Sequence, residues 1–93
     1  MRNIALVTGA SSGIGKEFVR EISKKYKGLD EIWVVARRRE RLRELRKEII
    51  GTRVRILPLD LMEQESFERL KMVLAKEQPV VRLSLIHISE PTR

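Results

Sequence analysis

The sequence contains no cysteine, few aromatic residues and no long apolar run. A chain without cysteine forms neither disulfides nor thiolate metal sites, which fits a cytoplasmic protein. Its apolar runs are far shorter than the roughly 18 residues of a membrane-spanning helix, and its first residues lead straight into a strand-like segment without a cleavable leader. We therefore expect a cytoplasmic protein with no membrane partner and no metal site.

The charge of the chain is strongly basic but mixed in sign. Twenty lysines and arginines against thirteen acidic residues give a net charge of +7. Such a balance suggests a nucleic-acid-binding protein, whose signature is a steeply salt-dependent affinity. The acidic residues are interspersed with the basic ones, however, and few aromatic residues lie among the arginines. Nucleic-acid binding is therefore the weaker alternative, and we expect no nucleic-acid partner.

Three glycines, Gly9, Gly13 and Gly15, fall within seven residues near the N-terminus. The apolar run Ile4–Val7 precedes them and the amphipathic stretch Ile14–Ile22 follows, which predicts a strand, a tight turn and a helix. Glycine permits a positive φ and leaves backbone N–H groups accessible, and the positive end of the helix points at the same place. This geometry suits a phosphate or pyrophosphate, but the spacing lacks the Gly-Lys-Ser/Thr ending of a P-loop.

The motif Thr8-Gly-x-x-x-Gly13-x-Gly15, placed directly after an N-terminal strand, resembles the cofactor fingerprint of the short-chain dehydrogenase/reductase family. An ordinary strand-to-helix turn is the alternative interpretation of a glycine pattern alone. The resemblance implies that the turn holds the pyrophosphate and the adjacent ribose of a dinucleotide. The residues so implied are Gly9, Ser11, Ser12, Gly13, Ile14 and Gly15.

Strand-like and helix-like segments alternate along the chain. Strands are predicted at Asn3–Thr8, at Glu31–Ala36, at Val54–Leu57 and from Val80. A first helix is predicted from Gly13 or Ile14, a second contains the apolar stripe of Leu42, Leu45 and Ile49, and a third covers Glu63–Glu77. Crossovers of this length predict right-handed βαβ units and parallel strands. We expect an α/β fold, the N-terminal half of a Rossmann-type doubly wound sheet with strand order 3-2-1. A fourth strand, at about Val81–Ile88, is hypothesised beside Ile4–Val7.

Apolar residues at helical spacing predict which side chains face the sheet. In the first helix these are Ile14, Phe18, Val19 and Ile22, and in the third helix they are Phe67, Leu70, Val73 and Leu74. Trp33, in the second predicted strand, is expected to pack under a helix.

Arginines follow the second predicted strand, at the position that selects between cofactors. In dinucleotide folds an acidic residue there accepts from the ribose 2′-OH, whereas an arginine accommodates a 2′-phosphate through parallel N–H bonds. The chain offers Arg37 and Arg38 with no carboxylate before Glu40, and the resembling family often has Ala-Arg-Arg here in NADP-preferring members. We expect Arg37 to bind the 2′-phosphate, Arg38 to bind it or stack on the adenine, and NADP to be favoured over NAD. From Arg39 onward the cations are interpreted as a solvated helix face.

Asp60 and Leu61 follow the third predicted strand, again at a carboxyl end, where open α/β sheets bind ligands. The resemblance implies that the Asp60 carboxylate accepts from the adenine amino group and that Leu61 contributes a backbone contact. The alternative is that Asp60 caps the following helix, and both interpretations stay open.

The resembling family has a catalytic serine and a Tyr-x-x-x-Lys pair beyond its fourth strand, and neither is present here. The sole tyrosine, Tyr26, is followed four residues later by Asp30 rather than lysine. We therefore assign no catalytic residue and expect the chain to be inactive by itself. It would be the cofactor-binding part of a homo-oligomeric oxidoreductase that moves hydride between NADP(H) and a carbonyl or alcohol substrate. The alternative is a stand-alone nucleotide-binding module without catalysis.

The last eleven residues, Leu83–Arg93, resemble the translation of a widely used transposase sequencing adapter, with every codon matching in one frame. We expect residues 1–82 to be a partial Rossmann NADP-binding domain and residues 83–93 to be a tail derived from the adapter. Ser84 and His87 therefore receive no functional role.

Overall fold

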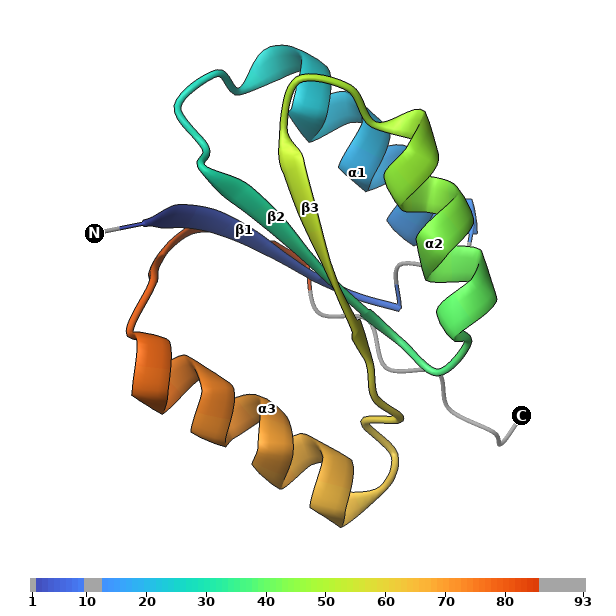
Figure 1. Cartoon of the computed structure of the whole chain (residues 1–93), viewed down its shortest axis with the longest axis vertical. Helices are drawn as coiled ribbons and strands as arrows, with labels where there is room; N and C mark the ends of the chain where they lie inside the picture. The colour runs from blue at the N-terminus through green and yellow to red at the C-terminus, as the bar shows by residue number, and fades with distance from the viewer. Residues whose placement is uncertain (1, 10–12, 86–93) are drawn as a thin grey trace.

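Strands and helices alternate from one end of the structure to the other. The computed structural model describes residues 2–9 and 13–85. Its elements there are β1 (Asn3–Thr8), α1 (Gly13–Lys25), β2 (Glu31–Ala36), α2 (Arg39–Glu48), β3 (Arg53–Pro58), α3 (Gln64–Glu77) and β4 (Val80–Leu85). The strands form one sheet of order β3-β2-β1-β4 in which all neighbours are parallel (Figure 1). The predicted α/β fold and the strand order 3-2-1 are confirmed, with a fourth strand beside β1.

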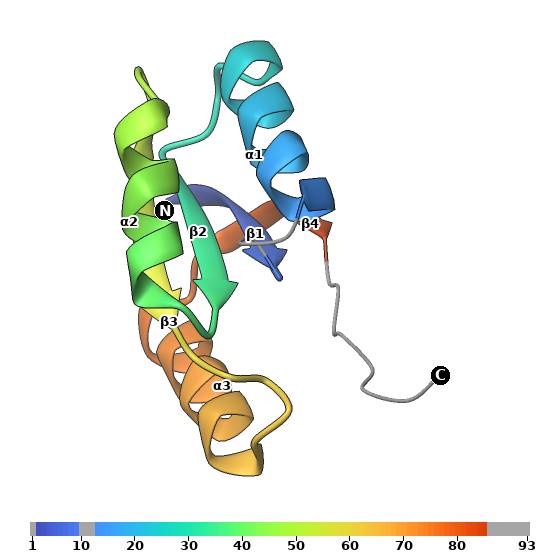
Figure 2. The same cartoon turned by 90° about the vertical axis from the view of Figure 1, so that its right-hand side faces the viewer.

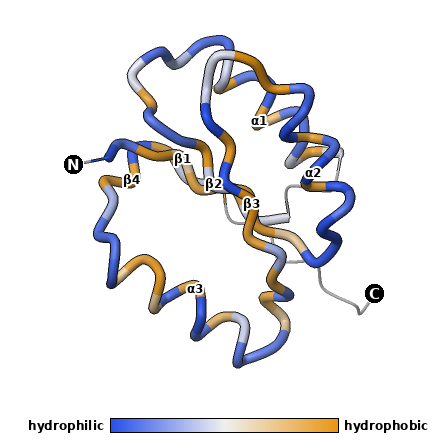
Figure 3. The backbone as a smooth tube through the Cα atoms, viewed as in Figure 1, coloured by the Kyte–Doolittle hydropathy of each residue, from blue (hydrophilic) through white to orange (hydrophobic). Residues whose placement is uncertain are grey.

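Helices cover both faces of this sheet. The two perpendicular views show α1 and α2 together on one face and α3 on the other (Figure 1, Figure 2). Strands covered on both faces are apolar without alternation, and β2 is buried along its whole length. Figure 3 shows the contrast between the hydrophobic strands and the predominantly hydrophilic α2. None of the helices in the described ranges has both the length and the apolar character needed to cross a bilayer.

The side chains of the sheet form two cores, one on each face. Under α1 and α2 the core contains Ala5, Val7, Val19, Ile22, Ile32, Val34, Ala36, Leu42, Leu45 and Val54. Under α3 it contains Ile4, Leu6, Trp33, Val35 and Leu70. Trp33 is fully buried, which confirms its prediction as a sheet residue packed under a helix.

Two residues of the predicted apolar stripes are exposed. Ile14 is 67% exposed and Phe67 is 43% exposed, so these two members of the stripes lie outside the core. Ile14 lies in the first turn of α1, whereas Val19 and Ile22 lie further along the helix and are buried. Phe67 lies on α3, which has no second described helix beside it on this face of the sheet (Figure 1).

β4 joins the sheet with one irregularity. Ile4 of β1 pairs with Val81, whereas the next residue, Ala5, pairs with Leu83. Arg82 is therefore an extra residue in β4. After this shift Leu83 packs against the core under α1 and α2. The hypothesised fourth strand is thereby confirmed as far as the end of β4, and the remainder of the hypothesised segment lies outside the described residues.

A polar network that no pattern in the sequence predicts crosses the face of the sheet under α3. Glu31 is 7% exposed and accepts a hydrogen bond from Trp33 Nε1 at 2.8 Å. The Arg55 guanidinium lies 4.7 Å from the centre of the Trp33 ring and donates to both carboxylate oxygens of Glu77, at 2.8 and 2.7 Å. Arg2 lies 3.3 Å from the Glu31 carboxylate and 3.2 Å from that of Glu77. Both carboxylates are therefore paired, as partly buried charges must be.

The network predicts a pH dependence of stability. The hydrogen bond from Arg55, together with the positive charges of Arg55 and Arg2, outweighs the effect of burial and lowers the pKa of Glu77. A carboxyl with a lowered pKa stabilises the fold above its unfolded pKa, and this stabilisation is lost as the pH falls through the folded-state pKa. We expect Glu77→Gln to lower the melting temperature at neutral pH, with the difference from wild type closing below the ordinary glutamate pKa of about 4.3.

Thermal unfolding followed by circular dichroism from neutral to acidic pH measures this difference. Glu68→Gln is the matched control, because Glu68 lies on the same helix and its nearest cation, Lys71, is exposed and 4.0 Å away. The control should leave the melting temperature nearly unchanged at every pH. A decrease in the melting temperature of Glu77→Gln that is the same at neutral and acidic pH would contradict the lowered pKa of Glu77.

Candidate functional site

The loops that follow β1, β2 and β3 leave the sheet at one edge. Thr8 pairs with Val35 and Ala36 with Pro58, so the carboxyl ends of the three parallel strands lie side by side. The glycine turn, the arginine pair and the Asp60 segment begin there in the spatial order of their strands (Figure 1). Open α/β sheets bind their ligands at this edge.

The described part of the glycine turn includes one residue with the positive φ that glycine permits. Gly9 adopts a φ of 67°, in the left-handed region that favours glycine. Gly13 opens α1 and is exposed, and a Cβ atom added to it would meet no described atom within 4 Å. Gly15 is buried within the same first turn. Ser11 and Ser12, which were predicted to act with these glycines, lie outside the described residues.

The start of α1 is suited to bind an anion that also has an apolar group. Its first turn contains no acidic side chain, so no carboxylate of the helix itself neutralises the positive end of the helix dipole. Ile14 presents an exposed apolar side chain there.

Arg37 and Arg38 lie where the sequence places them, directly after β2, and both are exposed. Arg38 is the N-cap residue of α2, with φ −97° and ψ 105°, and its side chain makes no capping hydrogen bond. Within the described residues neither guanidinium forms an ion pair. Cations at the positive end of a helix are unfavourable, and a bound anion would offset this cost.

Asp60 organises the turn between β3 and α3. Its Oδ1 accepts from the Met62 N–H at 3.0 Å and its backbone carbonyl accepts from the Glu63 N–H at 2.9 Å. The N-cap residue of α3 is Glu63, so Asp60 shapes the turn before the helix. The interpretation of Asp60 as the cap of this helix is therefore wrong. Leu61 packs with Leu57 and other apolar residues against the core under α3. The turn therefore fixes both residues at the carboxyl edge.

Thr8 is a residue at this edge to which the sequence assigned no role of its own. It is 2% exposed, and its hydroxyl donates to the Leu85 carbonyl at 3.5 Å, which links the ends of β1 and β4. No local pattern could reveal this contact, because the two residues lie far apart in the sequence. Residues 2–9 and 13–85 contain no group of three or more His, Cys, Asp or Glu side chains placed to hold a metal ion.

The parallel sheet, its strand order and the glycine turn after β1 define a Rossmann-type α/β fold. Residues 3–83 match the family model for short chain dehydrogenases. The chain therefore belongs to the short-chain dehydrogenase family of oxidoreductases.

Relatives of known structure or activity support this assignment. A 7beta-hydroxysteroid dehydrogenase of Clostridium sardiniense is 46% identical over 68 residues, which cover 70% of this chain and 25% of that protein. A metagenomic short-chain oxidoreductase solved in complex with NADP is 28% identical, with a TM-score of 0.73 over 88% of this chain and 37% of that one. L-sorbose reductase from Gluconobacter frateurii, complexed with NADPH and L-sorbose, shares the fold with a TM-score of 0.79 at 24% identity, over 96% of this chain and 34% of that one. The chain thus spans a quarter to somewhat over a third of the length of these relatives.

The backbone of the glycine turn can be tested without a ligand. An L-residue with a side chain in the left-handed region costs about 1–2 kcal/mol, so Gly9→Ala should lower the free energy of unfolding by that amount. Gly28→Ala is the matched control, because Gly28 is exposed and an added Cβ atom would meet nothing within 4 Å; it should stay within about 0.5 kcal/mol of wild type. Urea unfolding measures both, and equal effects of the two substitutions would contradict the assigned geometry.

Proposed function

We propose that this chain is the NADP-binding part of a short-chain oxidoreductase. The main support is the carboxyl edge of the sheet, where a turn suited to a pyrophosphate lies beside two exposed, unpaired arginines. No carboxylate follows β2 before Glu40, so the position that accepts from a ribose 2′-OH in NAD-binding folds is occupied by arginine. The NADP complex of the metagenomic relative is consistent with the same cofactor.

The pyrophosphate end of the cofactor fits the glycine turn. Gly9 provides the sharp turn, the open space at Gly13 admits the pyrophosphate, and the exposed Ile14 contacts the adjacent ribose. Backbone N–H groups at the start of α1 donate to the phosphate oxygens, with the helix dipole in support. The full set of residues proposed for this end is Gly9, Ser11, Ser12, Gly13, Ile14 and Gly15.

The adenosine end fits the loops after β2 and β3. Arg37 donates to the 2′-phosphate, and Arg38 donates to the same phosphate or stacks on the adenine. Asp60 holds its own turn through Oδ1, which leaves Oδ2 to accept from the adenine amino group. Leu61 supplies a backbone contact beside it.

NADP, when bound, supplies or accepts the hydride that interconverts a carbonyl and an alcohol. The groups that transfer the proton must lie within hydrogen-bond reach of the reacting atoms, and the catalytic serine and Tyr-x-x-x-Lys of the resembling family are not in this sequence. We therefore propose that these 93 residues bind the cofactor without turning over a substrate. The substrate and the remaining catalytic groups belong to the parent oxidoreductase, for which we propose a cytoplasmic homo-oligomer.

Residues 83–93 are proposed to derive from a DNA adapter. The family match ends at residue 83, where the adapter-like codons begin. Residues 83–85 nevertheless pair with β1. An unpaired strand edge can accept an apolar segment of high strand propensity, whatever its origin.

Arg37→Asp tests the cofactor assignment. A hydrogen bond to a charged group contributes about 1.5–3 kcal/mol, which corresponds to roughly a ten- to hundredfold change in affinity. We expect the variant to bind NADPH at least about tenfold more weakly, whereas its affinity for NADH stays the same or rises. Isothermal titration calorimetry with each cofactor measures both affinities.

Lys47→Asp is the control, because it makes the same charge change in the last turn of α2, away from the carboxyl edge. It should leave the ratio of the two affinities unchanged. The assignment fails if wild type binds NADPH and NADH equally, or if Arg37→Asp weakens both cofactors to the same extent.

A further inference from the structure

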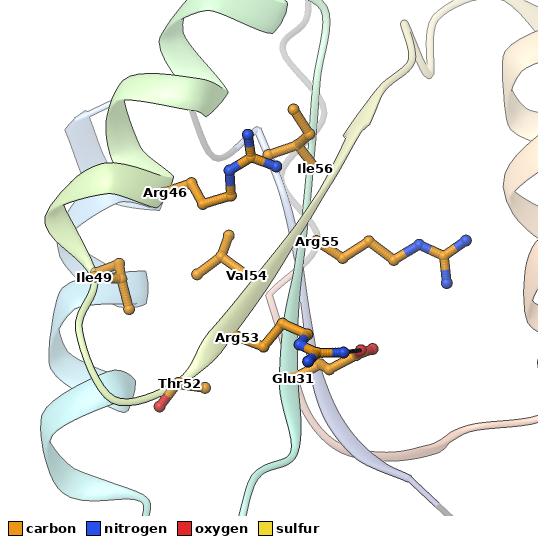
Figure 4. A pocket seen from close by; sticks show the side chains of 8 residues that line it. All are labelled: Glu31, Arg46, Ile49, Thr52, Arg53, Val54, Arg55 and Ile56. Atoms are coloured by element: carbon orange, nitrogen blue, oxygen red, sulfur yellow. Dashed lines mark ion pairs between the residues drawn. The ribbon is translucent and has the colours of Figure 1, made fainter.

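A groove of about 620 Å³ runs along the outer edge of β3 (Figure 4). It lies toward the amino end of β3, between that strand and the last turn of α2, and so at the opposite end from the proposed NADP site. Among the described residues β3 pairs only with β2. Backbone N–H and C=O groups on its other side are therefore available to another strand.

The side of the groove toward α2 is apolar. Val54 and Ile56 of β3 and Ile49 at the end of α2 line it (Figure 4). Side chains of an added strand alternate between the two faces of the sheet, so every second residue would contact this surface. A strand edge next to an apolar surface is a recurrent binding site for extended peptides.

The exposed surface of α2 is divided into two stripes of opposite charge. Arg39, Arg43, Arg46 and Lys47 recur at intervals of three and four residues and form the basic stripe, and Glu40, Glu44 and Glu48 form the acidic stripe. Glu48 lies 2.9 Å from Arg20 of α1, so this end of the acidic stripe faces α1. The basic stripe lies on the other flank of α2, where Arg46 borders the groove (Figure 4).

Charge on the basic stripe is not neutralised by the chain itself. Within residues 2–9 and 13–85 none of its four cations forms an ion pair. The helix dipole accounts for Arg46 and Lys47, which lie in the last turn. It does not account for Arg39 or Arg43, and like charges four residues apart destabilise a helix. On the other side of the groove Arg53 is 80% exposed and lies 3.9 Å from the carboxylate of Glu31, which also lines the groove and is paired with Arg2 as well.

We propose that the groove along β3 binds an extended acidic segment of a partner protein as an added strand. Its backbone pairs with the free edge of β3, and its carboxylates meet Arg46 and the rest of the basic stripe on one face and Arg53 on the other. A second copy of this chain is a poor occupant, because pairing two β3 edges would bring together two copies of the basic stripe and of Arg53. This surface does not depend on the proposed cofactor function.

A peptide of eight residues that repeats Glu-Glu-Val-Val places glutamate and valine on both faces of the added strand. It tests the proposal against the whole chain, by calorimetry and amide exchange at physiological salt. We expect saturable binding and slower exchange of amides in β3. Two further peptides separate backbone pairing from charge: one with every amide methylated, and one with lysine in place of glutamate. The methylated peptide should bind at least about tenfold more weakly, because neither of its edges keeps a backbone donor, and the lysine peptide should not bind.

Variants locate the site on α2. Arg46→Glu should weaken the acidic peptide at least about tenfold, and Arg43→Glu, farther from the groove on the same stripe, should weaken it less. Arg41→Glu makes the same charge change outside the basic stripe and should change the affinity less than about twofold. The proposal is overturned if the methylated peptide binds as tightly as its parent, or if Arg41→Glu and Arg46→Glu have equal effects. Competition by duplex DNA that depends on Arg46 would also overturn it, since the site would then be a general polyanion surface.

Discussion

Parallel pairing of β1 with β2 and β4 is the constraint on which the rest of the structure depends. A parallel neighbour is reached only by a connection that crosses a face of the sheet, so β1, β2 and β3 are each followed by a helix and both faces are covered. The same connections bring the loops after β1, β2 and β3 to one edge. Parallel pairing thus explains the burial of β1 and β2. It also explains why the glycine turn, the arginine pair and the Asp60 segment lie at the same edge.

Features that depend on residues near in sequence were predictable. The bounds of β1 and β2 follow from continuous apolar runs, and the helices between them follow from their periodicity. The exposure of Phe67 was not predictable from its place in an apolar stripe, because it depends on which helices lie beside α3. The Arg55–Glu77 network and the extra residue Arg82 were not predictable either, since they arise from partners on separate elements. The candidate site residues that the structure describes lie at the carboxyl edge, and their contacts with a cofactor stay a prediction.

Cationic side chains lie at both ends of α2. Arg37 and Arg38 stand at its start, beside the carboxyl edge, where a phosphate would relieve an uncapped helix end. The basic stripe continues from Arg39 toward its other end and borders the free edge of β3. The sequence alone favoured a solvated surface from Arg39 onward, because its charges alternate in sign along the chain. In three dimensions the helical repeat separates them, so that one flank of α2 is basic and the other is acidic, with Glu48 paired to Arg20 of α1.

The most direct test of the NADP assignment compares 2′,5′-ADP with 5′-AMP, which differ only in the phosphate assigned to Arg37 and Arg38. Backbone amide resonances of the isotopically labelled chain would be followed during titration with each nucleotide. The account predicts that both ligands perturb the amides around Asp60, and that 2′,5′-ADP binds more tightly and alone perturbs those of Arg37 and Arg38. Equal affinities with identical perturbations, or perturbations confined to surfaces away from the carboxyl edge, would contradict it.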